Sequence, residues 1–243
     1  MSSRLFYQSR LERPQLERAE GIYMWDVTGK RYIDGSSGAM VSNIGHSNPR
    51  VLNAMRHQME SATFGYRLHF QTEASEKLAE QAAALAPDGL GKVFFVSGGS
   101  EATESAMKLA RQYALARGDA QRYKVISRMP SYHGATLGAL AVTGYTPMTA
   151  PFDPMMRPMP KIPAPRAYLD GLDPDNPETG LFYAQMLEDK ILEVGPVFFE
   201  TGRVDVRHVI GNDVQLGFQG FHAGRGGIKG LNAHWFFLEI SGR

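Results

Sequence analysis

The segment Ser-Gly-Gly-Ser at 97–100 has residue types and a spacing that suggest a ligand-binding turn. They separate an apolar run at 92–96, typical of a strand, from an amphipathic segment at 101–117, which predicts a helix. Gly98 and Gly99 would let the backbone turn tightly, and the helix would point unpaired N–H groups at a ligand. Because the glycine pattern of a dinucleotide fingerprint and the lysine of a P-loop are missing, the turn favours a single phosphate monoester. A tight turn capped by serine, without a ligand, is the alternative.

A second candidate, the tripeptide Tyr132-His133-Gly134, follows the next predicted strand, at 123–127. If the strands on either side of the helix at 101–117 are parallel, the loops after them lie at the same sheet edge, where ligands bind. A tyrosine ring there could stack on a planar cofactor, and the histidine could hydrogen-bond to it. A phosphate site beside an aromatic ring suits pyridoxal phosphate, although a surface tyrosine and histidine would also explain the motif.

The chain resembles the N-terminal part of the class III pyridoxal-phosphate-dependent aminotransferases, of the type that uses amines and ω-amino acids. The resemblance covers residues 20–195. Motifs in the family's order carry it: YMWDVTGKRYIDG at 23–35, NIGH at 43–46 followed by Pro49, FFVSGGSEA at 94–102, and YHG at 132–134. Several ordered motifs make a chance similarity very improbable.

The resemblance implies which residues hold the cofactor. Gly99 and Ser100 would bind its phosphate, with Gly98 adjacent at a position where many family members have serine. Tyr132 would stack on the pyridine ring, with His133 nearby. This chain would therefore lack one hydroxyl contact to the phosphate.

The resemblance also implies a substrate pocket and a reaction. Ser37, Gly38 and Met40 fall where the family lines this pocket, and Met40 replaces a tryptophan of some amine-using members, which would make the pocket more pliable. The implied reaction moves an amino group from an amine or ω-amino acid to a keto acid such as pyruvate. The family is built as a homodimer with active sites at the interface.

Two further residues are needed for that reaction: a lysine that attaches the cofactor and transfers a proton, and an acid beside the pyridine nitrogen. In the family both come well after the Tyr-His-Gly motif, the acid in an Asp-Glu-Val context that this sequence lacks. Lys229, in Lys-Gly-Leu, is the candidate lysine, but it comes too early, and a surface lysine is the alternative.

Residues 196–243 do not resemble the family and contain none of the 12 methionines and 10 tyrosines of the chain. We therefore expect a truncated aminotransferase that is inactive alone. Two alternatives stay open: a non-catalytic module that binds pyridoxal phosphate or dimerises, and a product that does not fold stably.

The elements that must position these residues follow from hydrophobic periodicity and turn residues. The sequence predicts a hairpin at 22–35, strands at 92–96 and 123–127, and helices at 49–62, 72–86, 101–117 and 181–193. The strand, helix and strand between 92 and 127 predict a βαβ unit with parallel strands. Segment 145–180 holds nine of the 14 prolines and predicts a long loop without regular structure.

The resemblance implies an α/β fold, a partial fold-type-I transferase with a mostly parallel sheet flanked by helices and a small N-terminal α+β segment. Residues 1–45 would be the N-terminal segment of the small domain. Residues 46–195 would form an incomplete cofactor-binding large domain, and residues 196–243 an unrelated tail.

Composition excludes several classes of protein. A formal net charge of +1 provides no field to attract nucleic acid or an anionic membrane. The absence of cysteine excludes disulfides and thiolate zinc sites, and His208, His222 and His234 lack the spacing of metal ligands. With no apolar run of about 20 residues and no signal-peptide core, we expect a cytoplasmic protein.

Overall fold

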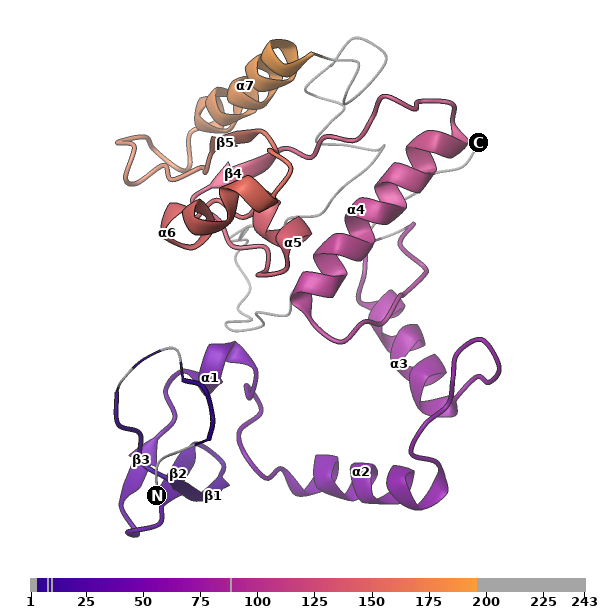
Figure 1. Cartoon of the computed structure of the whole chain (residues 1–243), viewed down its shortest axis with the longest axis vertical. Helices are drawn as coiled ribbons and strands as arrows, with labels where there is room; N and C mark the ends of the chain where they lie inside the picture. The colour runs from indigo at the N-terminus through magenta and orange to yellow at the C-terminus, as the bar shows by residue number, and fades with distance from the viewer. Residues whose placement is uncertain (1–3, 8, 10, 88, 196–243) are drawn as a thin grey trace. The chain divides into compact units, whose positions relative to one another are not determined.

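The computed structural model describes residues 4–195 except 8, 10 and 88 (Figure 1). The chain forms two compact units, of which the first extends to Ser75 and the second begins at Glu76. None of the helices in the described ranges combines the length and the apolar character needed to span a bilayer. Lys229 and the three histidines of the tail lie outside the described residues, so what is predicted for them stays a prediction.

An antiparallel sheet begins the first unit. Its strands, in spatial order, are β1 (Leu16–Glu20), β2 (Tyr23–Asp26) and β3 (Arg31–Ile33). The hairpin predicted at 22–35 is confirmed, since β2 and β3 pair and Gly29 takes φ +81° in the turn. Asp26 holds this turn, because its Oδ1 accepts hydrogen bonds from the N–H groups of Thr28 (2.9 Å) and Lys30 (3.1 Å).

β1 is a strand that the sequence analysis does not predict. Its residues, LERAE, lack the alternation of apolar and polar side chains that marks a half-buried strand. It forms by pairing with β2, where Arg18 is the register partner of Trp25. The Arg18 guanidinium carbon lies 3.5 Å from the centroid of the Trp25 ring, so a cation–π contact stabilises the pair.

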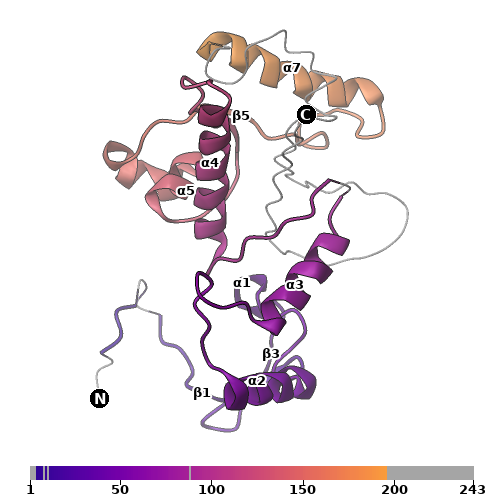
Figure 2. The same ribbon diagram turned by 90° about the vertical axis from the view of Figure 1, so that its right-hand side faces the viewer.

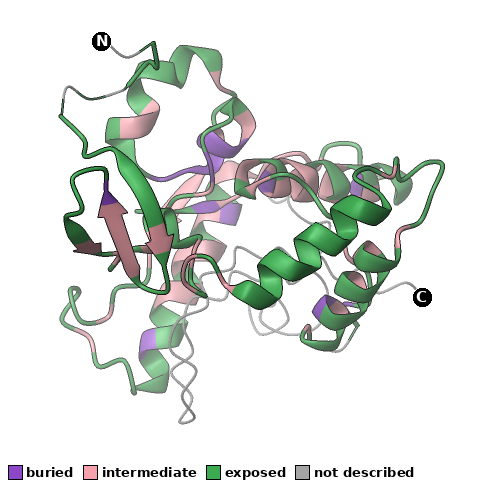
Figure 3. Ribbon diagram, turned by 90° about the horizontal axis from the view of Figure 1, so that it is seen from below, coloured by how far each residue is buried: buried purple, intermediate pink, exposed green. Residues whose placement is uncertain are grey.

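Helices follow the sheet. α1 (Ser37–Met40) is one irregular turn, whereas α2 (Pro49–Ser61) and α3 (Glu73–Ala84) confirm the helices predicted at 49–62 and 72–86. Asn48 caps α2, because its side chain accepts hydrogen bonds from the N–H groups of Arg50 and Val51. Within α2, all of which is described, no residue is buried, and its apolar side chains are exposed (Figure 3).

The second unit carries the longest helices. Its elements after α3 are α4 (Gly99–Ala116), β4 (Ser127–Met129), α5 (Leu137–Val142), α6 (Thr146–Thr149), η1 (Ala150–Met155), β5 (Lys161–Pro163) and α7 (Pro177–Val194). α4 contacts α5, and α7 contacts β5 (Figure 2). The most buried stretch of this unit is α5 with the residue after it: Ala139, Leu140, Val142 and Thr143 are each at most 3 % exposed.

The predicted βαβ unit is wrong in its strands, whereas its helix is confirmed as α4. Residues 92–96 join no sheet within the described ranges, and the strand predicted at 123–127 is displaced to Ser127–Met129. β4 pairs in parallel with β5 instead. The physical reason is that a strand exists only with a ladder partner, which an apolar run cannot specify.

The predicted loop at 145–180 is also wrong in part, because it contains α6, η1 and β5. Proline is tolerated in a first helical turn, where its missing N–H has no helical partner anyway, and α6 and η1 each have a proline there. β5 ends at Pro163, on a strand with a single partner. The helix predicted at 181–193 is confirmed as α7, which begins earlier at Pro177 behind the Asn176 cap.

Candidate functional site

The predicted phosphate turn forms the N-terminus of α4. Gly98 is the N-cap residue in an extended conformation (φ −165°, ψ 175°), and Gly99 is the first helical residue. No side chain from the described part of the chain caps this end. The N–H groups of a first helical turn have no partner inside the helix, so they remain available to an anion.

Glu101, an acidic residue in the same turn, lies close to Gly98. A Cβ atom placed on Gly98 would be 2.9 Å from Glu101 Oε2. The carboxylate therefore reaches back towards the start of the helix, where the helix dipole favours negative charge. An incoming phosphate meets this charge unless the flexible Glu101 side chain rotates away.

The phosphate turn and the tyrosine loop are in direct contact. The N–H of Ala135 donates a hydrogen bond to Ser100 Oγ at 3.0 Å. This bond links two motifs that are 35 positions apart, so the structure brings the predicted phosphate and ring residues together. Ser100 Oγ acts here as an acceptor, which leaves the hydroxyl proton to donate to a ligand.

Tyr132 precedes this contact in the loop after β4. It is 54 % exposed, so its ring is accessible to a planar ligand. The neighbouring His133 is partly buried, and its backbone is held at both polar groups. Its N–H donates to Thr143 Oγ1 at 3.0 Å, and its carbonyl accepts from Thr103 Oγ1 at 2.7 Å.

Gly134 allows the loop to approach α4 closely. It takes φ +132°, a conformation that residues with a side chain rarely adopt. A Cβ atom there would be 2.6 Å from Ser100 Oγ and 2.8 Å from Ala139 Cβ. Only glycine fits at this position without displacing the serine or α5.

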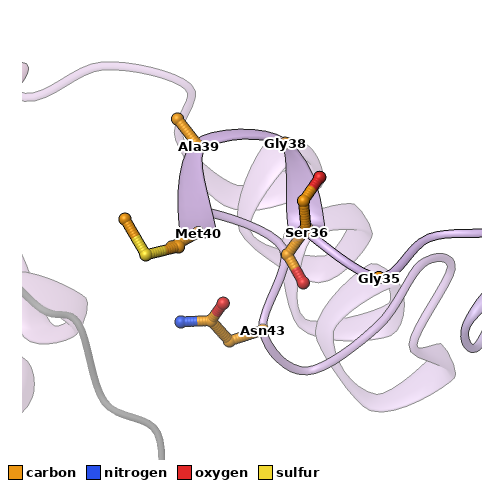
Figure 4. Close-up of a pocket in the computed structure, with 7 residues that line it drawn as sticks. Gly35, Ser36, Gly38, Ala39, Met40 and Asn43 are labelled. Carbon is orange, nitrogen blue, oxygen red and sulfur yellow. The ribbon is translucent and has the colours of Figure 1, made fainter.

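The predicted substrate residues lie in the first unit, on the irregular turn α1. A hollow of about 320 Å³ is lined by Gly35, Ser36, Ser37, Gly38, Ala39, Met40 and Asn43 (Figure 4). Ser37 and Met40 have positive φ angles, of 53° and 61°. Such angles are uncommon for residues other than glycine and mark a backbone that its surroundings hold in place.

A carboxylate and an imidazole hold this turn. Asp34 Oδ1 accepts from the N–H of Ser37 at 2.7 Å, and Asp34 Oδ2 lies 2.7 Å from His46 Nε2. The bond to His46 is the main reason why the pKa of Asp34 lies below its usual value. His46 is anchored in turn, since its N–H donates to the carbonyl of Gly21 and its own carbonyl accepts from the Gly21 N–H.

The structure thus brings together Gly98, Gly99, Ser100, Tyr132 and His133 in the second unit, and it groups Ser37 with Met40 in the first. Each group is a set of neighbours within its own unit. The weak candidate for the lysine, at position 229, lies outside the described residues.

Sequence reasoning missed three residues that shape these groups: Thr103, Thr143 and Asp34. Thr143 is a polar residue at the end of the apolar run LGALAV, which is the kind of signal that marks a buried hydrogen-bonding role. Thr103 lies on α4 one turn after Gly99, but nothing in its spacing points to a partner thirty positions away.

Comparisons with known proteins identify the family that the chain resembles. The family model described as Aminotransferase class-III matches residues 7–200. The uncharacterized aminotransferase YodT of Bacillus subtilis is 41% identical over 155 residues, which are 64% of this chain and 35% of that protein. The chain thus spans about a third of the length of this relative.

Solved structures resemble the chain as well. An (S)-enantioselective omega-transaminase from Thermomicrobium roseum superposes with a TM-score of 0.74 at 33% identity, covering 81% of this chain and 45% of that one. The omega transaminase from Pseudomonas jessenii, solved in complex with PMP, gives a TM-score of 0.73 at 31% identity with the same coverage. These similarities confirm the predicted resemblance and a partial α/β fold of the fold-type-I transferases.

Proposed function

The chain belongs to the class III aminotransferase family, and from this premise we propose that its second unit binds pyridoxal phosphate. The observation that carries the proposal is the hydrogen bond from the N–H of Ala135 to Ser100 Oγ, which joins the start of α4 to the tyrosine loop. Class III aminotransferases depend on this cofactor, and the similar transaminase from Pseudomonas jessenii was solved with PMP.

The groups at the start of α4 suit a phosphate monoester. The N–H groups of Gly99 and Ser100 belong to the first helical turn, and the Ser100 hydroxyl keeps a proton to donate. Gly98 contributes backbone alone, so we expect one hydroxyl contact fewer than in family members with serine there. The phosphate is held by neutral donors and the helix dipole.

The ring of the cofactor would lie against Tyr132. The exposed tyrosine ring offers a flat apolar surface, and the loop that carries it is fixed to the same helix end that would hold the phosphate. When bound, pyridoxal phosphate supplies an electron sink for the bonds that break at the carbon bearing the amine. Tyr132 and His133 then orient the ring and exclude water from one of its faces.

We propose an amine or ω-amino acid as amino donor and a keto acid such as pyruvate as acceptor. The similarity to an omega-transaminase supports this substrate class. Met40 on the hollow of the first unit has an unbranched, polarizable side chain, which can adapt to donors of different shape. Ser37 offers a hydroxyl beside it.

We further propose that these 243 residues alone bind the cofactor without completing the transfer. The family match ends at residue 200, and Lys229 lies beyond it. In that case the chain acts as a non-catalytic module that binds the cofactor or pairs with another subunit.

We propose that the chain pairs with a second aminotransferase subunit. We also propose that it does so in the cytoplasm. Apolar side chains on α2, Leu52, Met55 and Met59, are exposed although they recur at helical spacing. An apolar helical face of this kind supports contact with another protein surface.

Titration of the purified full chain with pyridoxal phosphate tests the proposal. We expect saturable binding, with affinity reduced in Ser100→Ala. Borohydride reduction followed by peptide mass spectrometry then asks whether a lysine carries the cofactor. Absence of any cofactor binding overturns the proposed function, and amine-dependent turnover would overturn the claim that the chain alone is inactive.

A further inference from the structure

The start of α4 and the tyrosine loop share one buried hydroxyl. Thr103 Oγ1 lies 3.1 Å from the carbonyl oxygen of Gly99 and 2.7 Å from that of His133. A threonine in a helix ordinarily donates to the carbonyl four residues back, which is Gly99 here. The shorter bond, to a residue thirty positions away, is the unusual one.

A second threonine completes the arrangement. Thr143 Oγ1 accepts the N–H of His133 at 3.0 Å and lies within hydrogen-bond distance of the carbonyl oxygens of Gly134 (3.1 Å) and Ala139 (3.0 Å). Both hydroxyls are shielded from water, since Thr103 is 5 % exposed and Thr143 is 2 % exposed. In a buried setting such bonds are costly to lose, because water cannot replace them.

The two hydroxyls hold both polar groups of the His133 backbone, and Thr103, one helical turn after Gly99, links that backbone to the start of α4. Gly99 belongs to the turn proposed for the phosphate, and His133 follows the tyrosine proposed for the ring. Pyridoxal phosphate carries its phosphate and its ring on one short linker. A site that holds both at the matching separation gains affinity, because binding of one end raises the effective concentration of the other.

We propose that Thr103 is a positioning residue, which sets the distance between the phosphate turn and the ring-binding loop through its bond to His133. The inference rests on the proposed cofactor site and extends it to a residue that touches neither end of the ligand. Thr143 supports the same loop from the side of α5.

Three probes separate positioning from mere stability: pyridoxamine phosphate, pyridoxamine and inorganic phosphate. None of them carries an aldehyde, so attachment to lysines does not interfere. Their affinities for the full chain are measured by calorimetry or tyrosine fluorescence, the last two at millimolar concentrations. The variants are Thr103→Val, which keeps the shape and removes the hydroxyl, and Thr103→Ser, which keeps the hydroxyl.

For Thr103→Val we expect pyridoxamine phosphate to bind about tenfold more weakly. Without the hydroxyl, the distance between the phosphate turn and the tyrosine loop no longer matches the distance between the phosphate and the ring of the ligand. Pyridoxamine and inorganic phosphate should each bind within about twofold of the wild-type affinity, since each engages one half of the site. Thr103→Ser should restore the binding of pyridoxamine phosphate. Thr149→Val is the control, because the Thr149 hydroxyl bonds locally to the carbonyl of Thr146.

The outcomes are distinct. If Thr103→Val binds pyridoxamine phosphate like the wild type, or if it weakens all three probes equally and lowers the melting temperature, Thr103 does not position the site. If the wild-type chain binds none of the probes, the proposed function fails, and this inference fails with it.

Discussion

His46 Nε2 lies 2.7 Å from Asp34 Oδ2, and the other oxygen of the same carboxylate accepts the N–H of Ser37 at 2.7 Å. One carboxylate therefore joins Ser37, at the start of α1, to His46, six positions after its end. Holding Ser37 and Met40 at positive φ costs about 1–3 kcal/mol for each residue, so the turn keeps its shape only while its surroundings hold it. The Asp34 carboxylate also accepts the N–H of Ser36 at 3.3 Å, so it restrains the start of the turn through two backbone groups.

Asp34→Asn should lower the midpoint of urea unfolding of the chain near neutral pH. Since folding depresses the pKa of this carboxyl, its contribution to stability is present above the ordinary value of 3.8 and is lost as the pH falls through the depressed value. The difference between variant and wild type should therefore shrink below pH 3.8. Urea curves between pH 3 and pH 7 check this, with Glu60→Gln on the exposed face of α2 as control. A difference that stays constant across this range would contradict the role given to Asp34.

Gly98→Ser should strengthen the binding of pyridoxamine phosphate by about three- to tenfold, the value of one added hydrogen bond. The extended φ of −165° accepts any residue, and the new side chain meets only the flexible end of Glu101. Gly98→Ala is the matched control, because it adds the Cβ atom without the hydroxyl. Equal strengthening by alanine would show that rigidity of the turn, rather than a hydroxyl contact, sets the affinity.

Gly134→Ala should destabilise the second unit by about 1–3 kcal/mol, as overpacking does, and should weaken cofactor binding with it. The added methyl group would lie 2.6 Å from Ser100 Oγ, at a φ of +132°. Gly180→Ala, in an exposed stretch of α7 with no atom within 4 Å of the new Cβ, should instead stabilise by about 0.4–1 kcal/mol. Chemical denaturation of both variants measures the contrast. A Gly134→Ala chain as stable as the wild type would refute the close approach of loop and helix.

Tyr132→Ala should weaken pyridoxamine phosphate binding by about tenfold, the order of one aromatic contact, and leave inorganic phosphate binding unchanged. Tyr132→Phe keeps the ring and should bind like the wild type. Because the side chain is 54 % exposed, neither substitution should alter the melting temperature much. Loss of binding in both variants would assign the role to the hydroxyl rather than to the ring.

Local patterns predicted the local elements of this fold. The hairpin around Gly29 and the helices α2, α3, α4 and α7 follow from turn residues, caps and periodic apolar positions, all of which act over a few residues. The strand predicted at 92–96 is wrong, because strand pairing depends on a partner far along the chain, which a local pattern cannot specify. β5 shows the converse, since proline-rich sequence forms a strand when β4 offers it a ladder.

The residues of the candidate site also fall into those that a local pattern predicts and those that it does not. Glycines between a strand-like run and a helix, and a tyrosine after the next extended segment, are visible as spacing, and the structure joins them through Ser100 and Ala135. Thr103 and Thr143 act through hydrogen bonds to backbone groups of the tyrosine loop, which lies thirty positions after Thr103 and ten positions before Thr143. Because every residue has backbone polar groups, such bonds leave no pattern of residue types at a fixed spacing. They are therefore visible only in the folded chain.

The bond between Thr103 and His133 spans thirty positions of the chain, and we expect this separation to decide when the site assembles during folding. The helix end can form early from its own residues, but the loop reaches it only after the intervening segment, which contains β4, has closed. If the chain binds the cofactor as proposed, we expect that affinity to be gained only after this closure. We expect a ligand that engages both halves to favour chains in which this closure is complete, and so to protect the second unit from proteolysis.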